Sequence, residues 1–262
     1  MPNETLRQLD ARKSVRVFEE REISAQDKAA ILRAAAMAPT AGNQQLYTIL
    51  DITDPALRAR LAETCDHQPF IASAKMALIF CADCQKWYDA FADAHCTPRK
   101  PGAGDLLLAV DDALIAAQNA VVAAQSLGIG SCYIGDIMEN CETHRALLRL
   151  PEYVFPAAML VFGYPTAQQR ERQKPERVAL KHIVHENGYR HMDAEELREM
   201  FAPKAAARGY EEWMRAFCER KYNSAFSREM SRSVARYLEN FMECAERKGK
   251  PAARSWAAGL EY

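Results

Sequence analysis

The sequence has almost no net charge and no long apolar run free of polar residues. Its 34 Lys and Arg residues nearly balance 35 Asp and Glu residues, which gives a net charge of −1. Such a chain has no general electrostatic attraction to nucleic acids or to anionic membranes. The most apolar stretch, residues 106–127, contains Asp111, Asp112 and Gln118 and is not expected to span a membrane. The acidic start Met1-Pro2-Asn3-Glu4 does not read as a secretory signal, so we expect a cytoplasmic protein.

Paired cysteines are also scarce. Of eight scattered cysteines, Cys81 and Cys84 have the spacing of a redox or metal pair, but no second pair or nearby histidine spacing completes a zinc site. Cys81 lies in an apolar strand pattern, which favours a core residue. We therefore expect free thiols, no bound metal and no catalytic thiol. The six histidines are expected at the surface or in connecting segments.

What the sequence does contain is enough apolar residues for one large core, with alternating helix and strand patterns. The runs 74–82 and 155–162 are apolar almost throughout, which predicts strands covered on both faces. Further strands are predicted over 46–52 and 129–134. Helices are predicted over 4–13, after Ser24, after Asp54, over 105–127 and over 143–149. Alanines occur on several sides of helix 105–127, which indicates a core or subunit-interface helix.

The composition changes beyond about Met192, which predicts a domain over residues 1–192 and a helical extension over 193–262. Helices are expected near 210–221 and 227–247. The second has an apolar stripe formed by Met230, Val234, Leu238, Phe241, Met242 and Ala245. This stripe predicts that the extension docks on the core or on a partner subunit.

Three short motifs carry the chemistry. Alternation places Arg12, Ser14 and Arg16 on one side of an extended segment, where guanidinium groups match phosphate oxygens; a solvated basic patch is the alternative. In 39–45, Thr40, Asn43 and Gln45 leave a tight turn, and their polar groups suit a heterocycle or a ribityl chain; a turn satisfied by its own backbone is equally compatible. In 128–136, three glycines let backbone N–H groups approach a planar ligand. The last motif follows a helix and is not the dinucleotide fingerprint.

In combination, these motifs make the sequence resemble the FMN-dependent nitroreductase/flavin reductase superfamily over about residues 6–189. The signature Arg-x-Ser-x-Arg/Lys matches 12–16, and Pro-Ser/Thr-x-x-Asn-x-Gln matches 39–45. The segment Gly-x-Gly-Ser/Thr-Cys-x-Ile-Gly matches 128–135, and residues 112–119 resemble the central interface helix of the family. The resemblance implies an α+β fold with a central, mainly antiparallel sheet flanked by helices, in an intertwined homodimer with FMN at the interface.

The resemblance also implies the residues of the cofactor site. The amide of Gly135 would face flavin N5, Gln68 would touch the polar edge of the flavin, and no side chain would be an essential acid or base. Thr40, Asn43 and Gln45 would reach the flavin from the neighbouring subunit. The remaining FMN-binding residues that it implies are Arg12, Lys13, Ser14, Arg16, Tyr133, Ile134, Lys174 and Arg177. Arg170 and Arg172 compete with the last two for the phosphate.

The activity implied is two-electron, ping-pong transfer from NADPH or NADH through FMN to a small acceptor such as a nitroaromatic or a quinone. Reductive dehalogenation or flavin-consuming chemistry on the same fold is one alternative. A flavin-binding sensor or partner-binding protein without catalysis is another, suggested by the helical extension. Leu46-Tyr47 stands where the family often has a tryptophan, so the acceptor pocket is left open. The Pro- and Gly-rich segment 97–104 predicts a mobile connection beside a site.

Overall fold

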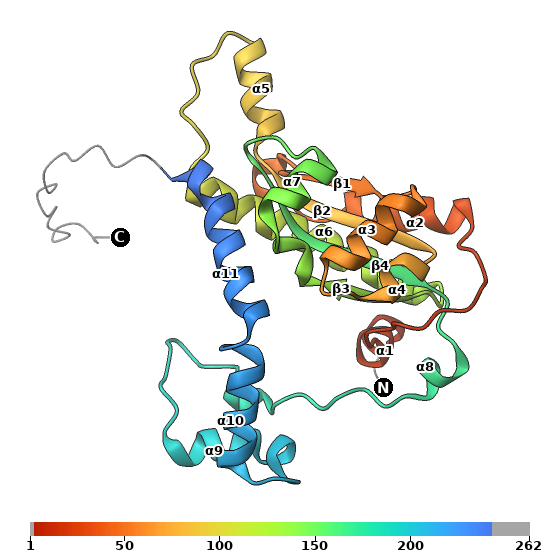
Figure 1. The fold of residues 1–262 in the computed structure, drawn as a ribbon, viewed down its shortest axis with the longest axis vertical. Coiled ribbons are helices and arrows are strands. Elements are labelled where there is room, and N and C mark those ends of the chain that lie inside the picture. Colours follow the sequence, from red (N-terminus) through yellow and green to blue (C-terminus); the bar gives the residue numbers. More distant parts are fainter. Residues whose placement is uncertain (1–2, 243–262) are drawn as a thin grey trace, which may run out of the picture.

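The structure, a computed structural model, describes residues 3–242. Its centre is an antiparallel sheet with the strand order β1-β2-β4-β3 (Figure 1). The strands are β1 (Tyr47–Asp51), β2 (Met76–Asp83), β3 (Gly130–Ile134) and β4 (Val154–Gly163). β2 and β4 are buried along their whole length, as their apolar runs predict. The α+β fold with a central antiparallel sheet is confirmed.

Helices surround this sheet and continue beyond it. The α-helices are α1 (Glu4–Ala11), α2 (Ala25–Ala36), α3 (Pro55–Thr64), α4 (Pro69–Ser73), α5 (Gln85–Asp93), α6 (Ala103–Ser126), α7 (Cys141–Leu148), α8 (Ala167–Glu171), α9 (Ala194–Ala205), α10 (Tyr210–Lys221) and α11 (Ala225–Leu238). Short 3-10 helices are η1 (Ala41–Asn43), η2 (Gly135–Met138), η3 (Leu180–His182) and η4 (Glu239–Phe241).

Two of the predicted helix starts illustrate how the sequence fixes these elements. The Ser24 hydroxyl accepts a hydrogen bond from the backbone N–H of Asp27 at 3.0 Å. Asp54 accepts one from the N–H of Ala56 at 2.9 Å, and Pro55 is the first helical residue. Each cap satisfies a backbone donor that has no partner inside the helix.

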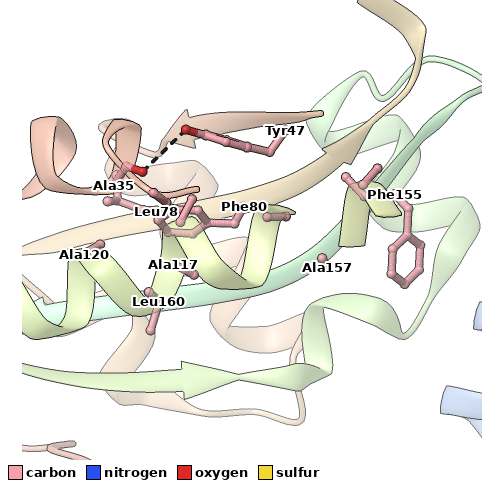
Figure 2. Close-up of a cluster of buried hydrophobic side chains, with 14 of the residues drawn as sticks. Ala35, Tyr47, Leu78, Phe80, Ala117, Ala120, Phe155, Ala157 and Leu160 are labelled. Atoms are coloured by element: carbon pink, nitrogen blue, oxygen red, sulfur yellow. Dashed lines mark hydrogen bonds between the residues drawn. The ribbon is translucent and has the colours of Figure 1, made fainter. Parts of the chain in front are cut away.

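α6 is the central core helix. Its Ala117 and Ala120 lie close to Leu78, Phe80 and Leu160 of the sheet, because small side chains let the helix approach (Figure 2). Nine of its 24 residues are buried. By length and composition alone α6 could cross a membrane, but it packs against the sheet instead. The opposite face of the sheet is covered by α3 and α4, through residues such as Leu61 and Ile71.

The C-terminal helices leave the sheet and return to it. α9 and α10 lie apart from the sheet, and α11 runs back toward α7 (Figure 1). Phe241 is buried, as predicted, with its ring 5.6 Å from that of Tyr153. Tyr153 belongs to the core of the same chain, so this contact docks the extension on the core, one of the two surfaces that the apolar stripe predicts. α11 ends at Leu238 rather than near 247, and Ala245 lies outside the described residues.

Candidate functional site

The first and third motifs lie side by side. The backbone N–H of Val15 donates to the carbonyl of Ser131 at 2.9 Å, and Ser14 forms a parallel bridge with Ser131. A Cβ atom on Gly130 would lie 2.6 Å from Cγ2 of Val15, so glycine is what allows this approach. Residues 12–16, which we call the basic strip, therefore extend the sheet beside β3.

In the basic strip, Arg12 has buried donor atoms that lack hydrogen-bond partners within residues 3–242. Its guanidinium lies 5.9 Å from the centre of the Tyr133 ring. Its Nε and Nη2 atoms are buried without a hydrogen-bond partner among the described residues. Burying charged donors without partners is costly, so this group is set up to receive an anionic or strongly polar ligand group. Arg16 is exposed beside it, with its guanidinium 5.8 Å from the centre of the Phe70 ring.

A second basic segment, residues 170–174, lies against the basic strip. The Lys13 ammonium donates to the carbonyls of Arg170, at 2.6 Å, and of Arg172. The Arg172 guanidinium donates to the carbonyl of Ser14 at 2.5 Å, and Lys174 donates to that of Asp10 at 2.9 Å. Backbone carbonyls thus hold several of these cations close together, which concentrates positive charge near Arg12.

Arg170 and Arg177, the other two candidates for the phosphate, have different surroundings from Lys174. Arg170 is engaged by the Glu19 carboxylate at 2.7 Å and by the carbonyl of Pro165 at 2.5 Å. Arg177 lies exposed in the segment between α8 and η3. Of the four cations that compete for the phosphate, Lys174 and Arg172 are the two whose side chains donate to backbone carbonyls of residues 10–14.

β3 presents its residues to opposite faces of the sheet. Tyr133 is half-buried, and its hydroxyl donates to the Gln118 side chain of α6 at 3.3 Å. Burial raises the pKa of Tyr133 to about 12, so its hydroxyl stays protonated at neutral pH. The Ile134 side chain is buried on the other face, together with Cys132 and Ile137. Any contact of Ile134 with a ligand at the Tyr133 face is therefore through its backbone.

Gly135 follows β3 directly and opens η2. A Cβ atom there would contact only the tip of Met138, at 3.8 Å, so the approach to its backbone is open on that side. Gln68 precedes α4 and donates to the carbonyl of Cys65 at 2.9 Å. Burial raises the pKa of the Asp136 carboxyl, and hydrogen bonding from Gln68 opposes that rise. Gln68 therefore lies at the same end of β3 as Gly135.

The second motif forms a tight corner held by Asp112 of α6. Asp112 accepts hydrogen bonds from the Thr40 hydroxyl, from the N–H of Ala41 at 3.0 Å and from the N–H of Leu46 at 3.0 Å. Gly42 has φ +57°, which favours glycine in this turn. Asn43 and Gln45 are exposed. Within residues 3–242 of one chain, no hydrogen bond joins this corner to the basic strip.

Sequence reasoning missed two features of this region. It did not assign Asp112 to the corner, because the hydrogen-bond partners of Asp112 lie about seventy positions away in the chain. It also placed all histidines at the surface or in connecting segments, whereas His144 and His182 are buried. His144 lies 2.9 Å from both the carbonyl of Ile137 and the hydroxyl of Thr64, which explains its burial.

Thiol and metal chemistry find no support in the described part of the chain. Burial raises the pKa of the Cys81 and Cys84 thiols to about 12, so neither forms a reactive thiolate at neutral pH. All seven cysteines of residues 3–242 are free. No group of three or more His, Cys, Asp or Glu side chains in this range is placed to hold a metal ion.

Known proteins of one family resemble this chain in sequence and in fold. The sequence model of the Nitroreductase family matches residues 9–164. The chain is 30% identical to the FMN reductase (NAD(P)H) of Bacillus subtilis, over 90% of this chain and 92% of that protein. It is 32% identical to the oxygen-insensitive NADPH nitroreductase of Salmonella typhimurium, over 72% of this chain and 76% of that protein. Its fold matches the NADPH:FMN oxidoreductase of Vibrio harveyi, solved with NAD+, with a TM-score of 0.77 at 24% identity, covering 90% and 98% of the two chains.

Proposed function

Because this chain belongs to the nitroreductase family, we propose that it is an FMN-dependent NAD(P)H oxidoreductase. When bound, FMN would supply two-electron redox chemistry at its N5 atom, with NADPH or NADH as the hydride donor and an oxidised small molecule as the acceptor. The acceptors are small oxidised molecules such as nitroaromatics and quinones. The non-catalytic sensor is not favoured, because the similar proteins named above are reductases.

One observation carries the fit to FMN: the Nε and Nη2 atoms of Arg12 are buried and have no hydrogen-bond partner within residues 3–242. A phosphate group or the polar edge of a flavin would satisfy those donors. Lys13, Ser14 and Arg16 lie on the same strip, and the Lys174 ammonium donates to the carbonyl of Asp10 beside it. Arg177 would add a further positive charge. Tyr133 provides an aromatic surface beside Arg12.

At the other end of β3, the Gly135 N–H would donate to the flavin at N5, and Gln68 would hydrogen-bond to its polar edge. The backbone of Ile134 lies between Tyr133 and Gly135. The residues of the chain thus bind and orient the cofactor, and cations near the pyrimidine would stabilise negative charge on the reduced ring. No side-chain acid or base is needed for this scheme.

The assembly that completes the site would be a homodimer. α6 leaves Leu107, Leu108, Leu114 and Ile115 at least 38% exposed in the single chain, an apolar face suited to a second copy. Thr40, Asn43 and Gln45 of one subunit would then reach the flavin of the other. The division into residues 1–192 and a helical extension over 193–262, and a cytoplasmic location, belong to the same proposal.

The test uses the full chain purified with FMN. We expect a yellow protein whose flavin absorbance bleaches anaerobically with NADPH or NADH and returns when a quinone or a nitroaromatic is added. Stopped-flow reduction with both nicotinamides separates an enzyme from a sensor, which would retain FMN but be reduced negligibly. A colourless protein that takes up no FMN would end the proposal. Analytical ultracentrifugation tests the homodimer.

A further inference from the structure

A cavity lies away from the basic strip, between α5, the segment after α5 and the start of α6. Its volume is about 340 Å³, which is within the range of small-molecule pockets. Trp87, Tyr88 and Phe91 of α5 contribute aromatic surface, while Pro98 and Leu108 contribute apolar surface. We call this cavity the α5 pocket.

Hydrogen bonds and ring contacts hold the aromatic walls of the α5 pocket in place. The Trp87 indole N–H donates to the carbonyl of Gln44 at 2.8 Å, which fixes the ring against the corner of the second motif. The rings of Trp87 and Phe91 are 5.7 Å apart and tilted by 42°. Tyr88 packs edge-on against Tyr153, with centroids 5.4 Å apart. A preformed aromatic wall loses little side-chain freedom when a flat ring binds, which favours planar ligands.

The charged residues that line the α5 pocket bind each other. The Arg99 guanidinium makes two hydrogen bonds to the Asp105 carboxylate, at 2.5 and 2.9 Å. Asp105 also accepts a hydrogen bond from the N–H of Gly102 at 2.7 Å, so the pair is anchored to the backbone. An anionic ligand would meet the Asp105 carboxylate here and compete with it for Arg99, which disfavours anionic ligands. The pocket therefore suits a neutral planar ring.

The position of the α5 pocket relates it to the second motif. The Gln44 side chain lines the pocket, and its neighbours Asn43 and Gln45 are the residues proposed to reach the flavin. Resting on the proposed function, we infer that the α5 pocket binds the electron acceptor, and that this acceptor is a neutral planar aromatic ring rather than a phosphorylated flavin. The relatives named FMN reductase would differ from this chain in that preference.

The test measures binding through Trp87 itself. In a holoenzyme carrying Trp213→Phe and Trp256→Phe, Trp87 is the remaining tryptophan, and quenching of its fluorescence by menadione gives a Kd. Phe91→Ala removes one aromatic wall and should weaken menadione binding about tenfold. The matched control is Tyr222→Ala, which removes an exposed aromatic residue outside the pocket and should leave the Kd unchanged.

Two further probes sharpen the test. 1,4-Naphthoquinone-2-sulfonate has a similar ring with a negative charge, and we expect it to bind at least about tenfold more weakly than menadione. Pro98→Trp adds bulk to the lining of the pocket and should raise KM for menadione while leaving FMN content and anaerobic bleaching unchanged.

The outcomes separate this inference from the proposed function. If the holoenzyme bleaches and reduces menadione, but Phe91→Ala and Pro98→Trp change neither Kd nor KM, the acceptor binds elsewhere and the proposed function stands. Tighter binding of the sulfonate, or turnover of free FMN above that of menadione, would also overturn the inference. A protein that takes up no FMN overturns both.

Discussion

Cγ2 of Val15 lies where a side chain on Gly130 would have to go, 2.6 Å from the position of a Cβ atom. This close approach brings the basic strip to β3, with the N–H of Val15 bonded to Ser131 at 2.9 Å. The relationship joins two motifs that are more than a hundred residues apart in the chain. It therefore determines where Arg12 and Arg16 stand relative to Gly135.

Gly130→Ala should displace the basic strip. We expect overpacking to cost about 1–3 kcal/mol of stability and FMN binding to weaken with it. Flavin fluorescence titration of the apoprotein and urea denaturation measure the two effects. Gly104→Ala is the control, because a Cβ atom there would meet nothing within 4 Å. Unchanged FMN affinity in Gly130→Ala would show that the strip does not position the cofactor.

Arg12→Ala should weaken FMN binding more than Arg170→Ala. Arg12 has buried donors without a partner in the described residues, whereas Arg170 is engaged by Glu19 and Pro165. Losing charge-assisted hydrogen bonds of about 1.5–3 kcal/mol corresponds to roughly ten- to hundredfold in Kd. The same fluorescence titration compares both variants. If Arg170→Ala has the larger effect, the phosphate assignment is wrong.

Ser233→Ala should loosen α11 from the core. The Ser233 hydroxyl donates to the carbonyl of Met138 at 2.6 Å and accepts from the N–H of Cys141 at 2.9 Å, and the residue is fully buried. Leaving two buried backbone groups unsatisfied should cost about 1–3 kcal/mol in urea denaturation. Ser231→Ala, two residues earlier in α11 and exposed, should change stability little. Equal effects of the two substitutions would contradict this role.

Glu139 should make stability fall as pH rises through neutrality. Burial, together with Asp136, Asp66 and Glu229, raises the pKa of its carboxyl to about 7, and its Oε1 atom has no partner in the described residues. Because the folded pKa lies above the ordinary value, ionisation destabilises the fold progressively from about pH 4.5 to above pH 7. Glu139→Gln should therefore raise Tm by about 2–4 °C at pH 8 and hardly at all at pH 4.5.

The control for this titration is Glu176→Gln, which changes an exposed carboxylate in the segment between α8 and η3. It should leave Tm nearly unchanged at both pH values. A gain in Tm for Glu139→Gln that is the same at pH 4.5 and pH 8 would mean that the glutamate destabilises through its shape rather than its charge.

The sequence predicted the elements better than the contacts between them. The strands β2 and β4 and the helices α6 and α10 follow from apolar runs and periodicity, which are local properties. The pairing of Ser14 with Ser131 has no such pattern, because a single bridge is set by the packing of Val15 on Gly130. The role of Asp112 depends on residues about seventy positions away, and nothing local marks it.

The C-terminal extension shows the same limit. An apolar stripe indicates that a helix is buried but not what covers it, so Phe241 was predicted buried and its partner was not. Tyr153 lies nearly ninety residues earlier in the chain, and only the fold brings the two rings together. The sequence predicted that the segment 97–104 lies beside a site, but not that residues of α5 and of the second motif complete the α5 pocket, because these segments are separate in the chain.

The return of α11 has a practical consequence for dividing this protein. Phe155 and Tyr153 each face an aromatic ring of the returning segment, Tyr237 and Phe241, at 5.1 and 5.6 Å. A fragment that stops at residue 192 would expose the rings of Tyr153 and Phe155 to water. It would leave an uncovered apolar patch where the extension packs. Such a fragment would self-associate for reasons unrelated to its natural assembly, so subunit stoichiometry should be measured on the intact polypeptide.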